Sequence, residues 1–233
     1  RSLADYESEY GSRAVDNDAT YDWLDGFFGE GGRKAFIGNY DTAYADGLAL
    51  FGPDLGPGQL VIADVAASDA VYTAMLVHAK ANNRVCVFDV GNADSLSTMN
   101  ALGDGLTADV DNDYGFIAGQ WLMIPPPRGV TGGSARQIPA SAAVCGLIAR
   151  ADALGNPNRA AAGRDFPLQY ATGFVTTFTD AEIDTALGHG VNLFAEKYGV
   201  LQLEGFQTAI DQSQDTPFWQ ANCSRARMWL AAK

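Results

Sequence analysis

The chain has 233 residues, of which 47% are hydrophobic and 18% are charged, and its formal net charge at pH 7 is −13. This composition excludes a disordered polypeptide, and the length suits a core that needs no disulfide or metal. The negative charge argues against a direct role on DNA or RNA, because such binding relies on Lys and Arg releasing counterions from phosphates. No apolar run is long enough to span a membrane.

The first half of the sequence alternates helical and strand patterns. Residues 20 to 28 carry apolar side chains at helical spacing and are followed by a glycine-rich stop, which predicts a helix. Residues 47 to 58 are rich in Gly and Pro and predict a loop. Strands are predicted at residues 33 to 40, 60 to 66, 85 to 90 and 115 to 124, and helices at residues 68 to 83, with Ser68 as the cap, and 95 to 106. Apolar strands separated by helices at this spacing predict a parallel sheet.

The second half begins with a predicted loop at residues 128 to 136 and a small-residue helix at residues 140 to 154. Thr179 and Glu182 have the spacing of a capping box, which predicts the start of another helix. The remaining elements are a strand or hairpin at residues 166 to 178, two short strands at 191 to 206 and an amphipathic helix at 217 to 232. With no repeat or linker visible, residues 1 to 233 are interpreted as one α/β unit with a mixed, largely parallel β-sheet flanked by α-helices.

Three cysteines, Cys86, Cys145 and Cys223, are widely spaced in apolar or small-residue surroundings and are predicted to be buried thiols in a reducing compartment. Neither of the two histidines has a second metal ligand three or four residues away, and neither a dinucleotide fingerprint nor a Gly-x-Ser-x-Gly motif is present. The sequence therefore predicts no cofactor and no resident metal.

Two aspartates remain as candidates for catalysis. Asp64 and Asp89 each follow an apolar strand, and ligands of such sheets bind beyond the carboxyl ends of the strands. Two neighbouring carboxylates there could hold Mg²⁺, which would make the protein a magnesium-dependent α/β enzyme. Asp is also common where a strand leads into a helix cap, and this structural role is the competing interpretation.

Four further segments of the sequence carry recognisable patterns: IPASAAVCGLIARADALGN, FFGEGGRKAFI, TDAEIDTALGHGVNLF, and LEGFQT followed by NCSRARMWL. Together they resemble contractile tail sheath proteins of myovirus-type phages. The first is similar to the family's Pro-Pro-Ser, a small-residue helix with an internal Gly, and Ala-Arg-Thr-Asp, and the second to Phe-Phe-x-x-Gly-Gly followed by a strand. The third is similar to a helix leading into Gly-Ile-Asn, and the fourth to Gly-Ala-Arg-Thr and an Arg-Arg helix. The matching positions are Pro139, Ser141, Gly146, Ala149, Arg150, Asp152 and Gly155; Phe27, Phe28, Gly31 and Gly32; Leu187, Gly190, Val191 and Asn192; and Gly205, Thr208, Arg225 and Arg227.

The sequence departs from this family pattern at three places. Ala151 replaces the usual Thr, Gln207 replaces the usual Arg, and the aromatic residue and Ala-Pro expected after Gly155 are absent. These departures affect expected subunit contacts more than the fold, and they indicate a divergent member, such as one from a large phage. Arg150 and Asp152 are expected either to form internal or surface contacts or to contact a neighbouring subunit, and both interpretations stay open. Phe218, Trp219 and Trp229 are expected to pack in the core or against the tube.

The resemblance implies a structural subunit, not an enzyme. Such a subunit polymerises around a tail tube and contracts by rigid-body rearrangement, which drives the tube through the host envelope. The implied partners are other sheath subunits, the tail tube protein, the baseplate and the tail terminator, with no nucleic acid and no membrane insertion. The implied location is the virion tail, assembled in the host cytoplasm; a contractile bacteriocin or a related injection device is a variant of the same class.

The resemblance also bears on the extent of the chain. Sheath proteins have an N-terminal arm and a C-terminal domain that have no counterpart in this sequence, which starts at Arg1 and ends at Lys233 directly after a helical pattern. We therefore expect a sheath-core fragment, trimmed by a trypsin-like protease or truncated, that is a monomer in solution.

Overall fold

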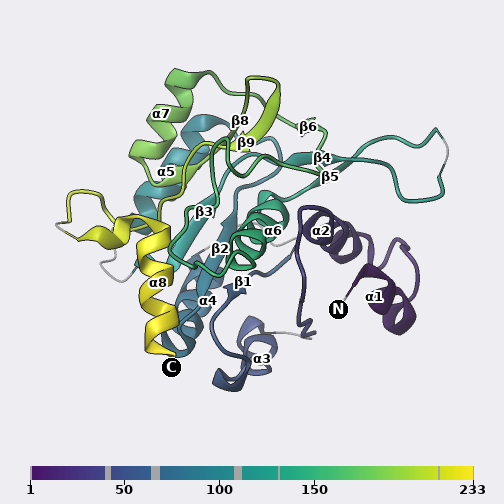
Figure 1. Cartoon of the computed structure of the whole chain (residues 1–233), viewed down its shortest axis with the longest axis horizontal. Helices are drawn as coiled ribbons and strands as arrows, with labels where there is room; N and C mark the ends of the chain where they lie inside the picture. The colour runs from purple at the N-terminus through teal and green to yellow at the C-terminus, as the bar shows by residue number, and fades with distance from the viewer. Residues whose placement is uncertain are drawn as a thin grey trace.

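The computed structural model describes residues 2–39, 43–63, 69–107, 112–130, 132–214 and 216–232 (Figure 1). Its centre is a four-stranded sheet in the order β1-β2-β3-β7, and all three strand pairs are parallel. The strands are β1 (Gln59–Leu60), β2 (Val85–Asp89), β3 (Gly115–Ala118) and β7 (Val191–Asn192). The predicted fold class, a largely parallel sheet flanked by helices, is confirmed.

Helices cover both faces of this sheet, which explains why β2 is apolar throughout. Val85 and Val87 belong to one hydrophobic cluster, and Cys86 and Phe88 belong to another, as expected when successive side chains point to opposite faces. The first cluster includes residues of α2 (Asp18–Gly29), α6 (Ala140–Asp152) and α8 (Ala221–Ala231). The second includes residues of α4 (Asp69–Asn82), α5 (Leu96–Thr107) and α7 (Asp180–Gly188). Two short helices, α1 (Leu3–Tyr10) and α3 (Tyr44–Ala49), lie at the periphery (Figure 1).

Most predicted helices are confirmed. The helices expected at residues 20 to 28, 68 to 83, 95 to 106, 140 to 154 and 217 to 232 are α2, α4, α5, α6 and α8. The Thr179 capping box is present, with the Thr179 N–H donating to Glu182 Oε2 at 2.8 Å. Ser68, the predicted cap of α4, lies outside the described residues. Helix α3 was not predicted, because its residues lie partly in the glycine-rich stretch that indicated a loop.

Two strand predictions are wrong over the residues that the structure describes. In the run 33 to 40, residues 33 to 39 form no regular secondary structure and no strand within the described ranges pairs with them, while residue 40 lies outside the described residues. In the run 60 to 66, only Leu60 belongs to a strand, β1; residues 61 to 63 do not pair, and residues 64 to 66 lie outside the described residues. Apolar, β-branched sequence favours an extended chain in both places, but a strand also requires a neighbour to pair with.

The single strand predicted at residues 115 to 124 is two strands in different sheets. After β3 the chain turns at Gln120, whose φ is 21°, and continues as β4 (Leu122–Ile124). The buried Gln120 amide replaces a ladder contact, since its Nε2 donates to the Phe194 carbonyl at 2.8 Å and its Oε1 accepts from the Phe194 N–H at 3.1 Å. β4 then pairs antiparallel with β5 (Arg136–Ile138) and β6 (Gly173–Phe174).

The two strands expected around a turn at residues 191 to 206 are present as β8 (Phe194–Lys197) and β9 (Val200–Leu203), after β7. Three short 3₁₀ helices, Pro53–Leu55, Asn112–Tyr114 and Pro217–Trp219, complete the described elements. Cys86 and Cys145 are buried free thiols as predicted, whereas Cys223 is only half-buried. None of the helices in the described ranges has the length and hydropathy that crossing a bilayer requires.

The turn between β8 and β9 places a tyrosine in a conformation that favours glycine. Tyr198 has a φ of 55° and Gly199 a φ of 76°, the combination that two-residue hairpin turns usually fill with Asn-Gly. We expect Tyr198→Asn and Tyr198→Gly to raise the free energy of unfolding by about 1 kcal/mol, because the left-handed conformation disfavours a tyrosine. Urea denaturation measures this. Tyr198→Ala, which keeps a Cβ at the same φ, is the control and is expected to gain nothing; lower stability in the Asn and Gly variants would contradict the assignment of strain.

Candidate functional site

The first two sheath-like motifs meet where the end of α2 passes over α6. A Cβ atom on Gly146 would lie 2.6 Å from Glu30 Cβ and 2.9 Å from the Phe27 carbonyl oxygen, so only glycine permits this approach. Gly31, with a φ of 102°, turns the chain directly above Arg150, whose Cδ would lie 3.3 Å from a Cβ at Gly31. Motifs more than 100 residues apart in the sequence therefore form one contact.

The neighbouring motif residues close the same turn. The Gly32 N–H donates to the Phe27 carbonyl at 2.8 Å, and a Cβ on Gly32 would lie 2.4 Å from the Phe27 ring. The Gly31 N–H donates to the Phe28 carbonyl at 3.2 Å, and the half-buried Phe28 ring packs edge-on against Phe27. The Phe-Phe-x-x-Gly-Gly segment is thus a helix end folded back on its own aromatic residue.

Glu30, inside this segment, is a structural residue that sequence reasoning missed. Its carboxylate is buried and accepts three backbone N–H groups, from Gln169 at 2.7 Å, Tyr170 at 2.9 Å and Ala171 at 2.8 Å. These hydrogen bonds fix the chain ahead of β6 against the end of α2. No local pattern indicates this role, because the partners are backbone groups about 140 positions away in the sequence.

The start of α6 is held by Asp89, one of the two aspartates of the magnesium hypothesis. Pro139 is the N-cap residue of the helix, and Ser141 lies in its first turn; the Ser141 N–H donates to Asp89 Oδ1 at 2.7 Å, and its hydroxyl donates to Oδ2. Trp23 Nε1 in turn donates to the Ser141 hydroxyl at 2.8 Å. A carboxylate in this place satisfies N–H groups that a helix start leaves without partners.

This arrangement agrees with the competing interpretation of Asp89, in which the aspartate binds the start of a helix and has no catalytic role. Both of its oxygens are engaged by Ser141, and Asp64 lies outside the described residues. Within the described ranges, no group of three or more His, Cys, Asp and Glu side chains is arranged to hold a metal ion. The magnesium hypothesis therefore receives no support from this strand end.

Arg150 and Asp152 make separate internal contacts. Arg150 Nη2 donates to the Pro167 carbonyl at 2.6 Å, and its guanidinium lies 5.7 Å from the centre of the Phe166 ring. Asp152 forms an ion pair with Arg225 of α8, which is 2% exposed. The first and fourth motifs are thereby joined at the carboxyl end of α6, while a further contact of either residue with a neighbouring subunit stays a prediction.

The third motif joins the fourth around Asn192, which is fully buried. Asn192 Nδ2 donates to the carbonyl oxygens of Ile117 at 3.0 Å and Gln207 at 2.9 Å, and its Oδ1 accepts the Gln207 N–H at 2.8 Å. A Cβ on Gly205 would lie 2.7 Å from Asn192 Oδ1, so glycine allows the chain to pass this close. Gly190, with a φ of 74°, turns the end of α7 into β7.

The remaining motif residues attach α8 and the 3₁₀ helix before it. Thr208 Oγ1 donates to the Phe218 carbonyl, and the Thr208 N–H donates to the Trp219 carbonyl, both at 2.8 Å. Arg227 Nη2 lies 2.5 Å from Asp113 Oδ2, and its guanidinium lies 4.5 Å from the centre of the Phe218 ring. The fourth motif is therefore attached to the rest of the molecule through the hydrogen bonds of Thr208 and through the ion pair that Arg227 of α8 forms with Asp113.

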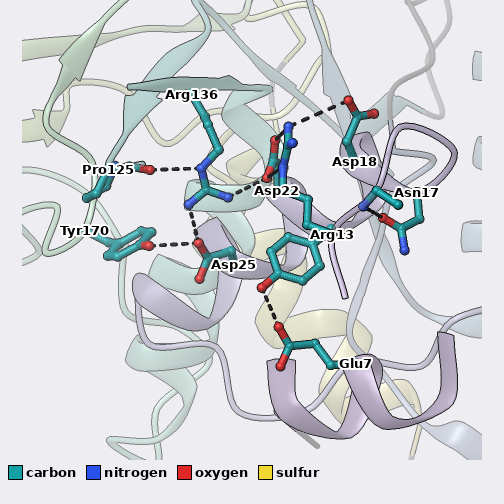
Figure 2. A network of polar contacts seen from close by, with 11 residues as sticks. Glu7, Arg13, Asn17, Asp18, Asp22, Asp25, Pro125, Arg136 and Tyr170 are labelled. Atoms are coloured by element: carbon teal, nitrogen blue, oxygen red, sulfur yellow. Dashed lines mark hydrogen bonds and ion pairs between the residues drawn. The ribbon is translucent and has the colours of Figure 1, made fainter. Parts of the chain in front are cut away.

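A second polar network, absent from the sequence analysis, ties the N-terminal helices to the β4–β5 hairpin (Figure 2). The buried Arg136 forms ion pairs with Asp22 and Asp25 of α2, and its Nε donates to the Pro125 carbonyl at 2.9 Å. Arg13 binds the Asp22 carboxylate through Nε at 2.8 Å and Nη2 at 2.7 Å. Tyr170 also belongs to the network, since its hydroxyl donates to Asp25 Oδ2 at 2.8 Å. A buried arginine shared by two carboxylates has its charge compensated and its donors largely satisfied.

Asp89 predicts a specific pH dependence of stability. Burial raises the pKa of Asp89 from 3.8 to about 7, although the Ser141 hydrogen bonds oppose the rise. A group whose folded pKa is raised contributes stability that is present below its unfolded pKa and is lost as pH rises toward the folded pKa. We therefore expect a loss of about 1.4 kcal/mol per pH unit from this group between roughly pH 5 and 6.

The Asp89→Asn variant should lose this slope, which unfolding experiments across that pH range measure as a smaller dependence than in the wild type. Asp184→Asn, which changes an exposed aspartate of α7, is the control and should keep the wild-type slope. Equal slopes in Asp89→Asn and the wild type would show that the Asp89 pKa is not raised.

The close approach at Gly146 leads to a prediction for the stability of a variant with one added methyl group at the α2–α6 contact. Gly146→Ala is expected to lower the free energy of unfolding by about 1–3 kcal/mol, because the added carbon overlaps backbone and a buried side-chain stem. Gly105→Ala, a helical glycine of α5 with nothing within 4 Å of the new carbon, should gain up to about 1 kcal/mol. Urea denaturation of both variants compares the two, and similar values would contradict the close approach at Gly146.

Comparisons with known proteins identify solved structures that share this fold. No protein-family profile and no curated protein sequence matches the chain. Among solved structures, a chain of the contracted sheath complex of PVC, an extracellular contractile injection system, aligns with a TM-score of 0.72 and 18% identity, over 99% of this chain and 61% of that one. A chain of the anti-feeding prophage (AFP) baseplate aligns with a TM-score of 0.64 and 18% identity, over 97% of this chain and 59% of that one. The chain thus spans about three fifths of the length of these two relatives and shares their α/β fold.

Proposed function

We propose that the protein is a structural subunit of a contractile sheath that polymerises around a tube and contracts by rigid-body rearrangement of its subunits. The observation that carries this proposal is the alignment with the PVC sheath complex over 99% of the chain at a TM-score of 0.72. The resemblance of four sequence segments to tail sheath proteins is independent support, because it rests on residue identities that a comparison of backbones does not use.

The positions of the motif residues support a role that depends on rigidity. They meet in pairs at helix ends, turns and buried ion pairs, such as Gly146 with Phe27 and Asp152 with Arg225. A subunit that moves as a rigid body needs helices that keep their positions when the lattice changes. The carboxylate at the end of β2 serves as a helix cap, and we propose a structural role without catalysis.

The partners follow from the same proposal. They are other sheath subunits, a tube protein, a baseplate and a terminator, in a phage tail or a related injection device assembled inside a bacterial host. Residues 1 to 233 would form one α/β unit of this subunit, the sheath core. The 61% coverage of the PVC chain leaves room in such proteins for further lattice contacts outside the part matched here.

Negative-stain electron microscopy of the protein expressed alone from its complete reading frame tests the proposal. We expect hollow, striated tubes, because sheath subunits carry the contacts of their own lattice. The 233-residue chain alone is the matched comparison and is expected to stay dispersed. Dispersed particles in both samples, together with a rise in melting temperature on adding Mg²⁺, would overturn the sheath role and favour the magnesium enzyme.

A further inference from the structure

A cleft of about 650 Å³ opens between α2, α3, β1 and residues 33 to 39. Its lining is largely apolar, with aromatic rings from Trp23, Phe27, Phe36 and Phe51. Phe36 and its neighbour Ile37 are 50% and 41% exposed, so this apolar surface is uncovered at the mouth of the cleft. Exposed apolar surface of this kind in a folded chain indicates an interaction site.

The charged side chains that line the cleft are mostly basic. They are Arg33, Lys34, Arg84 and Asp152. Asp152 is neutralised by Arg225, and Arg84 directs its guanidinium at the backbone carbonyls of residues 51, 52 and 56. Arg33 and Lys34 are exposed, so the rim of the cleft is positive in a chain whose net charge is −13. The partner that fits is therefore apolar at its centre and acidic around it.

The β8–β9 hairpin offers a surface of this chemistry. Tyr198 at its tip is 87% exposed and has a φ of 55°, a conformation that Asn or Gly adopts without strain. Arg164 lies over the Tyr198 ring, 5.8 Å from its centre. An aromatic side chain kept exposed at a strained position suits an anchor for another molecule, since tyrosine is enriched at the centres of interfaces.

The surroundings of this tip are acidic. Glu196 is exposed beside Tyr198, and Asp180 and Asp184 are exposed on the adjacent α7. The one lysine of the hairpin, Lys197, is already paired with Glu204 at 2.9 Å and Asp180 at 3.4 Å. Four carboxylates, Glu196, Asp180, Asp184 and Glu204, thus stand against the two cations Lys197 and Arg164, so the surroundings of the tyrosine keep an excess of negative charge.

The two surfaces lie at opposite ends of the molecule, with α7 and the β8–β9 hairpin at one end and α3, beside the cleft, at the other (Figure 1). We propose that the Tyr198 tip of one copy inserts into the cleft of the next, with Glu196 facing Arg33 and Lys34. A contact between two different surfaces of the same chain is heterologous, and repetition of it produces open rows or helices of subunits. The inference rests on the proposed sheath function and names one of its lattice contacts.

Disulfide trapping tests the contact in the 233-residue chain, even where association is weak. In a Cys223→Ser background, the pair Val200→Cys with Ile37→Cys keeps the Tyr198 anchor and should give a ladder of covalent multimers on non-reducing gels, because each copy provides both halves. The matched control pairs Val200→Cys with Val15→Cys, since Val15 is 94% exposed and lies outside the cleft. Equal ladders from the two pairs would overturn the proposal.

Charge reversal tests the contact a second way. If Lys34 and Glu196 only stabilised the fold of their own subunit, reversing both charges would not restore the yield of cross-linked multimers. Lys34→Glu or Glu196→Lys, each added to the trapping pair, should lower the ladder yield at least about fivefold, and the two together should restore it. The yield should also fall as salt is raised, because the facing charges are exposed. Failure of the double reversal to restore cross-linking would contradict the pairing of Glu196 with the basic rim.

A third experiment distinguishes failure of the proposed contact from failure of the proposed sheath function. Tyr198→Asn in the complete reading frame is expected to abolish striated tubes while leaving the subunit folded. Normal tubes from Tyr198→Asn would refute the contact and leave the sheath role standing. A cross-linked ladder combined with no tubes from the wild-type protein would support the contact and refute the sheath role.

Discussion

Helix α6 is buried along nearly its whole length, and three contacts of different kinds fix it there. At its start the Asp89 carboxylate binds Ser141, in its middle Gly146 touches the backbone of α2, and at its end Asp152 pairs with Arg225. An alanine-rich helix has few large side chains to define its position, because small residues allow it to slide or rotate at little energetic cost. The polar contacts at both ends and the close approach between them remove that freedom. The position of α2, which packs along this helix, depends on it directly, and α8 is joined to its end through the Asp152–Arg225 pair.

The sequence allowed prediction of those parts of the fold that are set by neighbouring residues. The unbroken apolar run of β2 identified a strand covered on both faces, and the Thr179–Glu182 pair identified a helix start, because the relevant partners are adjacent or three residues apart. The parts that were missed depend on distant partners. The break at Gln120 exists because the Phe194 peptide can accept and donate to its side chain. Residues 33 to 39 have strand-like composition, but composition cannot reveal the absence of a pairing neighbour.

The motif residues were identified by resemblance, and their physical roles required the structure. Glycines 146, 31 and 205 lie at close approaches, and Asn192 binds the backbone of Gln207 with its side chain. This last contact holds the backbone at position 207 whatever side chain the residue carries. Glu30 and Arg136 could not be identified in advance, because their partners are backbone groups or carboxylates more than 100 residues away.

The link between the two sheets has a mechanical consequence. Gln120 holds both the N–H and the carbonyl of Phe194, and the β4–β5 hairpin that follows extends well outside the body of the protein (Figure 1). Bending the hairpin at this link would break two buried hydrogen bonds together, and leaving their groups without partners costs about 1–3 kcal/mol each. The joint between β3 and β4 is therefore held by more than the covalent chain, and the antiparallel β4–β5–β6 sheet keeps a fixed orientation relative to the parallel sheet.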